Sequence, residues 1–75
     1  MPKATQFSRK TFGLAVRRER ERRGISQEEF AEAAEVHRTY ISSIELGKVN
    51  VGIEVANQLA RALGFRLSDL VRAAE

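Results

Sequence analysis

The chain has 75 residues, with 13 Lys or Arg against 10 Asp or Glu, a formal net charge of +3 and no cysteine. This length favours one domain without a separate catalytic or ligand-sensing module, and the absence of thiols excludes a disulfide framework and a thiolate metal site. The apolar runs are far too short for a membrane span, and the first residues lack the apolar segment of a signal peptide. We therefore expect a soluble, cytoplasmic protein with no membrane partner.

Positive charge is concentrated near the N-terminus. Residues 1–23 hold eight Lys or Arg against two Glu, a balance of +6, whereas residues 24–75 hold five against eight acidic residues, a balance of −3. A basic end of this kind favours a polyanionic partner, because each neutralised phosphate releases counterions. Taken alone, the feature is explained more simply by a solvated basic helix.

Residues 1–8 show no periodic apolar pattern, so we expect a mobile arm before a single domain of residues 9–75. Lys3 would allow such an arm to follow a phosphate backbone or enter a minor groove, although a disordered tail is the simpler interpretation. Ser8 is suited to cap a first helix. The spacing of apolar residues predicts that this helix runs from Arg9 to Arg23.

The inner face of this first helix includes Phe12 and Val16, which are four residues apart. Arg20 continues the same face at the next step of four. A guanidinium at a core-facing position needs a partner, because an unpaired buried charge is costly. We predict that this partner is Glu45, and that both residues are structural.

The stretch from Ser26 to Glu45 reads as two short helices joined by a turn. Ser26 with Glu29 three residues later forms a capping-box pattern, which predicts a helix beginning at Gln27. A second helix is expected over Arg38 to Leu46. The residues on its outer arc are small and polar apart from one arginine: Arg38, Thr39, Ser42 and Ser43.

That outer arc has the properties of a helix that can enter a groove, since its short side chains leave the helix free to approach. The major groove of B-DNA admits one α-helix and displays guanine O6 and N7, which an arginine can bind bidentately. An ordinary solvated helix face is the simpler explanation for this helix considered alone. Tyr40 lies at the edge of the arc, where packing and a phosphate or base contact are equally good explanations.

The short turn between these helices predicts a steep crossing, with Val36 filling the corner. His37 is the only histidine and lies at or beside the following N-cap. Without cysteines to help, one histidine cannot build a metal site, so capping or phosphate contact is favoured and no metal is expected. The loop after the second helix contains Lys48 and Asn50, both suited to contact phosphate.

Two further helices complete the chain. A helix over Ile53 to Leu63 has a regular apolar face, which comprises Ile53, Ala56, Leu59, Ala60 and Leu63. Ser68 and Asp69 then signal the start of a short last helix. The apolar residues from the end of one helix through the next exceed what a small core needs, so we expect a dimer interface there: Phe65, Leu67, Leu70, Val71 and Ala74.

Five helices without a repeat predict an all-α domain, and no catalytic or phosphate-loop pattern is present, so we expect no enzyme and no cofactor. The ordered patterns RxxxGxSQEExA, RTYISxIExG and LARALG between Phe12 and Leu70 resemble the Cro/cI-type, or XRE, helix-turn-helix family. The resemblance implies a five-helix lambda-repressor-like fold, an Arg20–Glu45 ion pair and a phosphate contact from Gln27. It also implies base reading by Arg38, Thr39 and Ser43.

The RTYIS run, followed by IE and an Asn, is also similar to the controller proteins of restriction–modification systems, in which the matching Arg, Thr and Tyr lie at the DNA. Four positions depart from the family pattern. Glu35 replaces a turn glycine, Glu19 an apolar residue, Ala56 a leucine, and Val49 a basic or polar residue of controllers. A left-handed Glu35 would be strained by about 1 kcal/mol.

We therefore expect a bacterial or phage transcriptional regulator, associated with the nucleoid, that binds double-stranded DNA as a homodimer. Two symmetric recognition helices predict a palindrome with half-sites about 10–10.5 bp apart. The side chains expected at the DNA backbone are Gln27, His37, Tyr40, Ser42, Lys48 and Asn50. The alternative is an antitoxin or other protein-interaction module that binds DNA secondarily and uses the apolar residues Leu46, Val49 and Val51.

Overall fold

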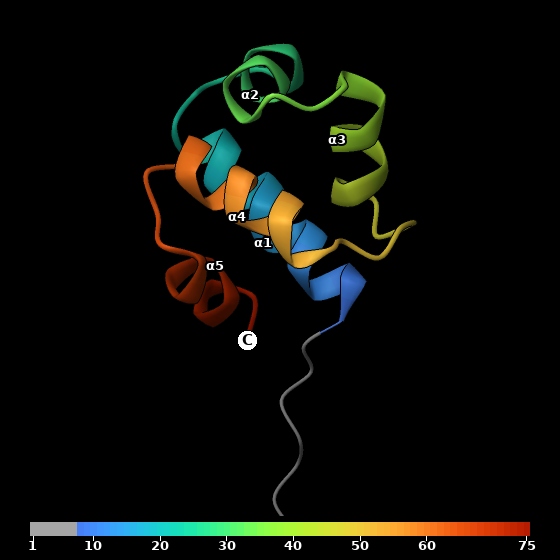
Figure 1. Cartoon of the computed structure of the whole chain (residues 1–75), viewed down its shortest axis with the longest axis vertical. Coiled ribbons are helices and arrows are strands. Elements are labelled where there is room, and N and C mark those ends of the chain that lie inside the picture. Colours follow the sequence, from blue (N-terminus) through green and yellow to red (C-terminus); the bar gives the residue numbers. More distant parts are fainter. Residues whose placement is uncertain (1–7) are drawn as a thin grey trace, which may run out of the picture.

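The computed structural model describes residues 8–75, so the arm expected over residues 1–8, including Lys3, lies outside the described residues except for Ser8. Residues 8–75 form five helices and no strand, which confirms the all-α fold (Figure 1). They are α1 (Arg9–Arg22), α2 (Gln27–Ala34), α3 (Arg38–Glu45), α4 (Ile53–Ala62) and α5 (Leu67–Ala73). The predicted ends of α1, α3 and α4 run one residue too far, because that residue is in each case the C-cap.

Side chains close the N-terminal ends of the first three helices. Ser26 and Glu29 form the predicted capping box, in which Glu29 N–H donates to Ser26 Oγ at 3.0 Å and Ser26 N–H donates to Glu29 Oε1 at 2.7 Å. Ser8 caps α1 in the same manner. His37 is the N-cap of α3, and its Nδ1 accepts a hydrogen bond from Thr39 N–H at 3.1 Å. These contacts satisfy backbone donors that a helix leaves unpaired.

The predicted start of α5 was wrong. Ser68 lies inside the helix, and the N-cap is Arg66, whose backbone is extended. Asp69 accepts a hydrogen bond from Arg66 N–H at 3.1 Å. Asp69 therefore acts from the third helical position, as the acidic residue of a capping box does, and the helix begins earlier than the Ser-Asp pair suggested.

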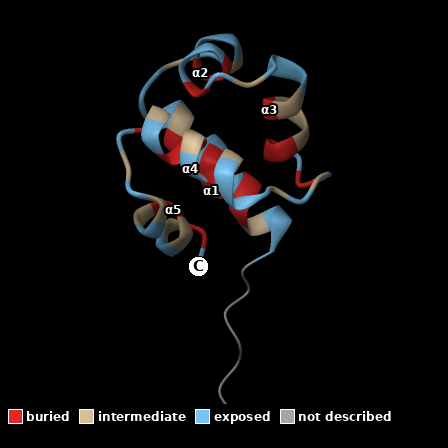
Figure 2. Ribbon diagram, in the orientation of Figure 1, coloured by how far each residue is buried: buried red, intermediate tan, exposed pale blue. Residues whose placement is uncertain are grey.

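The core lies among the five helices, where α1 packs against α3 and α5, and α4 packs against α2 and α5 (Figure 2). Its largest fully buried side chains come from all five helices: Val16, Phe30, Ile41, Ile44, Leu59 and Leu70. Ile41 and Ile44 thus turn one side of α3 inward, as their spacing predicts. The other side of α3 is left for contacts outside the domain.

Ile53 is a second correction, since it is 74% exposed and does not join the core. The apolar face of α4 begins at Ala56, which is buried. Ile53 is the first residue of the helix and projects past the edge of the core, so its correct helical spacing does not bring it a packing partner.

The turn between α2 and α3 is a point of backbone strain. Glu35 ends α2 in the left-handed region, with φ 61° and ψ 40°. In that conformation Glu35 N–H still donates to Glu32 O at 3.2 Å, and Gln58 of α4 donates to the carbonyl of Ala34 at 3.0 Å. The turn therefore closes α2 at the cost of a conformation that glycine adopts more easily.

Helix α1 touches α3 on one side and α5 on the other (Figure 1). Gly13 makes the contact with α3 possible, because a Cβ atom there would lie 2.0 Å from the carbonyl oxygen of Ile44. Towards α5, Arg18 Nη2 donates to the carbonyl of Ala73 at 3.1 Å. The guanidinium of Arg23 lies 5.0 Å from the ring centre of Phe65, a cation–π distance.

Candidate nucleic-acid interface

A buried ion pair fixes α3 against α1. Arg20 donates from Nε to Glu45 Oε2 at 2.6 Å and from Nη2 to Oε1 at 3.0 Å, while Nη1 donates to the carbonyl of Ile25 at 2.8 Å. The two side chains are 11% and 3% exposed. The hydrogen bond to Glu45 raises the pKa of the Arg20 guanidinium, so this group stays charged. Arg20 and Glu45 thus form the contact that helical spacing predicts.

Gln27 belongs to the same network. Its amide nitrogen donates to Glu45 Oε1 at 3.0 Å, and the residue is half-buried at the start of α2. The amide retains one more hydrogen, and the hollow beside it has a volume of about 230 Å³. That hollow is lined by Arg17, Arg20, Gln27, Ser42, Glu45 and Leu46. Gln27 therefore helps to hold α3 in place through its hydrogen bond to Glu45.

The outer side of α3 carries the residues predicted to read bases. Arg38 and Thr39 are exposed in its first turn, and Ser42 and Ser43 are half-buried farther along. Tyr40 is half-buried and packs against the hydrophobic core. The helix therefore presents its most accessible polar side chains at its N-terminal end, where helices of this type meet base edges.

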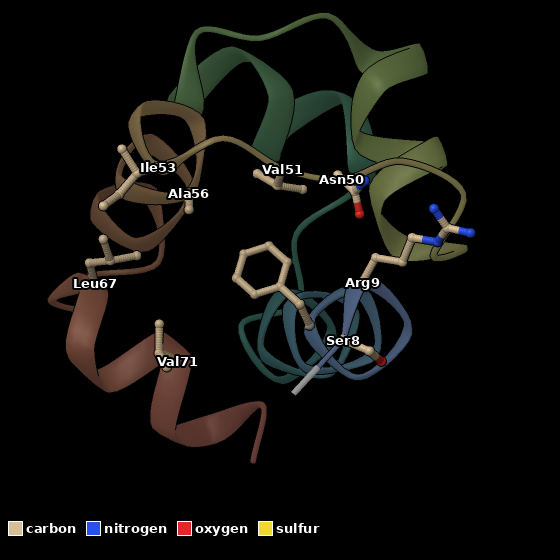
Figure 3. A pocket seen from close by; sticks show the side chains of 9 residues that line it. Ser8, Arg9, Asn50, Val51, Ile53, Ala56, Leu67 and Val71 are labelled. Carbon is tan, nitrogen blue, oxygen red and sulfur yellow. The ribbon is translucent and has the colours of Figure 1, made fainter. Parts of the chain in front are cut away.

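The loop after α3 adds exposed polar residues close to the start of α1. Lys48 and Asn50 are both exposed, and Lys48 N–H donates to the carbonyl of Ser43 at 3.0 Å. Arg9 and Asn50 line the same cavity (Figure 3), and Lys10 packs against the glycine that ends α3. Sequence reasoning did not single out Arg9 and Lys10 as neighbours of this loop, because the fold alone brings them there.

Much of the positive charge of α1 is committed to contacts within the domain. Arg17 Nε lies 3.1 Å from Glu21 Oε2, and Arg22 and Arg23 lie 3.1 and 2.9 Å from the carboxylate oxygens of Glu19. The excess of +6 in residues 1–23 therefore overstates the charge that this helix offers to a polyanion. Arg9 and Lys10, in the first turn of α1, lie near the loop that follows α3.

Glu19 is a buried carboxylate that sequence reasoning noted only as a departure from the family pattern. It is 5% exposed. The hydrogen bond from Arg23 lowers the pKa of its carboxyl below the ordinary value of 4.5, with help from Arg22 and against the effect of burial. The arginines that follow at three and four residues were the available signal for this pairing.

Two of the five residues expected at a dimer interface are buried within this chain. Leu70 is 0% and Ala74 5% exposed, because both pack into the core of their own chain. Phe65, Leu67 and Val71 are half-buried and remain available at the surface. Predicting all five residues as interface was wrong for the two that face inward.

A mainly apolar cavity of about 440 Å³ opens beside these residues, between α1, α4 and α5 (Figure 3). Leu67 and Val71 line it together with the exposed Ile53. The remaining lining residues are Ser8, Arg9, Phe12, Asn50, Val51 and Ala56. Of the apolar residues expected to meet a protein partner, Leu46 is 57% exposed, whereas Val49 and Val51 are half-buried.

Other kinds of site find no support in residues 8–75. No three His, Asp or Glu side chains gather there as metal ligands. None of the helices in this part of the chain has the length and apolar character needed to span a bilayer.

Comparison with known proteins identifies related regulators. The control protein C.BamHI of Bacillus amyloliquefaciens is 41% identical over 68 residues, which cover 89% of this chain and 84% of that protein. Among solved structures, the clp gene regulator ClgR from Corynebacterium glutamicum has a TM-score of 0.83 at 33% identity, covering 88% of this chain and 70% of ClgR.

The restriction–modification controller protein C.AhdI from Aeromonas hydrophila has a TM-score of 0.80 at 32% identity, covering 83% of this chain and 94% of that one. The similarity to control proteins holds although Val49 departs from their pattern. The helix-turn-helix family model matches residues 16–70, which include the whole motif. The chain therefore belongs to the XRE-type helix-turn-helix family of DNA-binding regulators.

Proposed function

We propose that this protein is a sequence-specific transcriptional regulator that binds a palindromic operator as a homodimer. The observation that carries the proposal is the two-sided construction of α3. Its inner side is fixed by Ile41, Ile44 and the Arg20–Glu45 pair, while its N-terminal turn presents Arg38 and Thr39 to the outside. A rigid helix with accessible polar side chains is suited to reading base edges in a major groove.

Base reading is assigned to Arg38, Thr39 and Ser43. Contacts to the DNA backbone set the position of the domain but carry no sequence information, and Lys48 and Asn50 are well exposed for this role. The residues proposed to assist them are Gln27, His37, Tyr40 and Ser42. His37 can donate from Nε2, because Nδ1 is the acceptor in the helix cap.

Dimerisation is assigned to the face formed by Phe65, Leu67, Val71 and Ile53. One exposed and three half-buried apolar residues beside an apolar cavity make a self-complementary contact favourable, since a second copy would remove their remaining exposed surface from water. The dimer would space its two reading helices about one turn of DNA apart. The similarity to control proteins makes restriction–modification genes the first targets to test, in the cytoplasm and on the nucleoid.

Selection of bound duplexes from a random pool tests the function directly. A recovered palindrome supports the proposal, whereas enrichment that follows charge alone contradicts it. Arg38→Ala should then weaken binding to the selected duplex by about 1–3 kcal/mol and relax selectivity at one base pair in each half-site. Arg61→Ala, which removes an exposed arginine from α4, is the matched control and should leave selectivity unchanged.

A further inference from the structure

Glu28 in the first turn of α2 faces the arginine expected to read bases. Its carboxylate Oε2 lies 3.9 Å from Nε of Arg38, and the side chains are 80% and 57% exposed. The pair joins the two helices of the motif on its solvent side. It therefore places an acidic group beside the base-reading residue in the free protein.

The atoms involved in this contact leave the end of the guanidinium accessible. Nε lies on the side edge of the group, whereas Nη1 and Nη2 form the fork that can bind guanine O6 and N7 together. A carboxylate on the Nε side thus restrains the long arginine side chain without occupying its fork. At 3.9 Å the contact is electrostatic, and approach of DNA would strengthen it by displacing water.

We infer that Glu28 is a positioning residue for base reading, an inference that rests on the proposed function. It orients Arg38 so that its terminal nitrogens point outward, which favours a site that offers guanine. Its negative charge also lies close to where phosphates approach, which disfavours every duplex to a similar extent. The two effects together raise the ratio of specific to non-specific affinity above what Arg38 alone provides.

The variant Glu28→Gln separates these effects when two duplexes are used, the selected duplex and a scrambled duplex of equal length. Affinity for the scrambled duplex should rise, because one repulsive charge is removed. The affinity ratio of selected to scrambled duplex should fall by about two- to fivefold, the range for an exposed ion pair. An equal rise for both duplexes, or an unchanged ratio, overturns the inference.

Two controls make the result specific. Glu54→Gln removes an exposed carboxylate from the same position, the second residue, of helix α4, and should leave the ratio unchanged. In an Arg38→Lys background, Glu28→Gln should also leave the ratio unchanged, because lysine has no fork to orient. A fall in the ratio in that background would show that Glu28 acts without Arg38, contrary to the inference.

A measurement without DNA distinguishes this inference from the function on which it rests. Substitution of Glu28 by Gln should shift the side-chain Nε–H resonance of Arg38 in the NMR spectrum of the free protein, whereas Glu54→Gln should not. No shift overturns the contact itself. If Glu28→Gln shifts this resonance but the wild-type protein selects no DNA sequence, the contact stands, whereas the proposed function and the positioning role are overturned.

Discussion

Two buried carboxylates show how the same residue type can hold this domain together over different distances. Glu45 as a whole residue is 8% exposed, and it binds Arg20, which lies 25 positions earlier in the chain. Glu19 is 5% exposed, and its partners Arg22 and Arg23 are three and four positions away on the same helix. The first pairing fixes one helix against another, whereas the second stabilises only the end of α1.

The difference matters because only the long-range pair governs where α3 lies. Removing Glu45 leaves a mostly buried guanidinium without its partner and also deprives Gln27 of its acceptor. Removing the charge of Glu19 leaves two arginines of which one is 70% and the other 32% exposed, so water can replace the lost contact. Four substitutions, in order of decreasing expected effect, test this distinction and the strain in the turn that precedes α3.

Glu45→Ala should lower the free energy of unfolding by about 3–5 kcal/mol, as loss of one partner from a buried ion pair does. Urea unfolding followed by circular dichroism measures the change. Replacing both partners, with Arg20→Met and Glu45→Leu, should recover most of the loss because no unpaired charge remains. A loss below about 1 kcal/mol for the single variant would place Glu45 with the exposed ion pairs instead.

Gly13→Ala tests whether the close backbone contact between α1 and α3 also fixes the position of α3. The new methyl group would lie 2.0 Å from the Ile44 carbonyl oxygen, so the helices must separate. We expect a loss near the upper end of the 1–3 kcal/mol typical of overpacking, about 3 kcal/mol. Gly52→Ala is the control, since a Cβ there meets nothing within 4 Å; equal losses in both variants would contradict the steric explanation.

Glu19→Gln should lower the free energy of unfolding by only about 1 kcal/mol at neutral pH, because its arginine partners are accessible to water. The lowered pKa of the Glu19 carboxyl gives the pH dependence. Its contribution is complete above the unfolded-state pKa and is lost as the pH falls through the lower, folded-state pKa. Unfolding curves of wild type and variant should therefore converge in acid, and a constant difference down to pH 2 would contradict the assignment.

Glu35→Gly should raise the free energy of unfolding by up to about 1 kcal/mol, because glycine adopts the left-handed conformation without steric cost. Glu35→Gln is the matched control: it removes the negative charge from the C-terminal end of α2, where the helix dipole disfavours it, but keeps the side chain. A gain of equal size in both variants would assign the effect to charge. Thermal unfolding resolves differences of this size in a small domain.

The sequence predicted the fold well where local pattern and tertiary contact agree. Capping residues and apolar spacing predicted all five helices, although the Ser68–Asp69 signal placed the start of α5 too late. The helical position of Arg20 identified Glu45 as its partner. The other failures came from the edges of the core. Helical spacing could not reveal that Ile53 extends past the last packing partner, or that Leu70 faces inward, because both depend on where neighbouring helices end.

The candidate site divides in a similar way. Arg38 and Thr39 could be placed on the outer arc of α3 from their positions alone. The contact of Gln27 with Glu45, the proximity of Glu28 to Arg38 and the position of Arg9 near Asn50 arise from the crossing of separate helices. No spacing within a single element encodes such contacts.

The position of α1 has a further consequence for the spacing of the two half-sites that a dimer would bind. It touches α3 through Gly13 and Arg20, and it touches the C-terminal segment through Arg18 and Arg23. Helix α1 thus joins α3, proposed to read bases, to the face proposed for dimerisation. In the proposed symmetric dimer, the distance between the two copies of α3 would therefore depend on the length of α1.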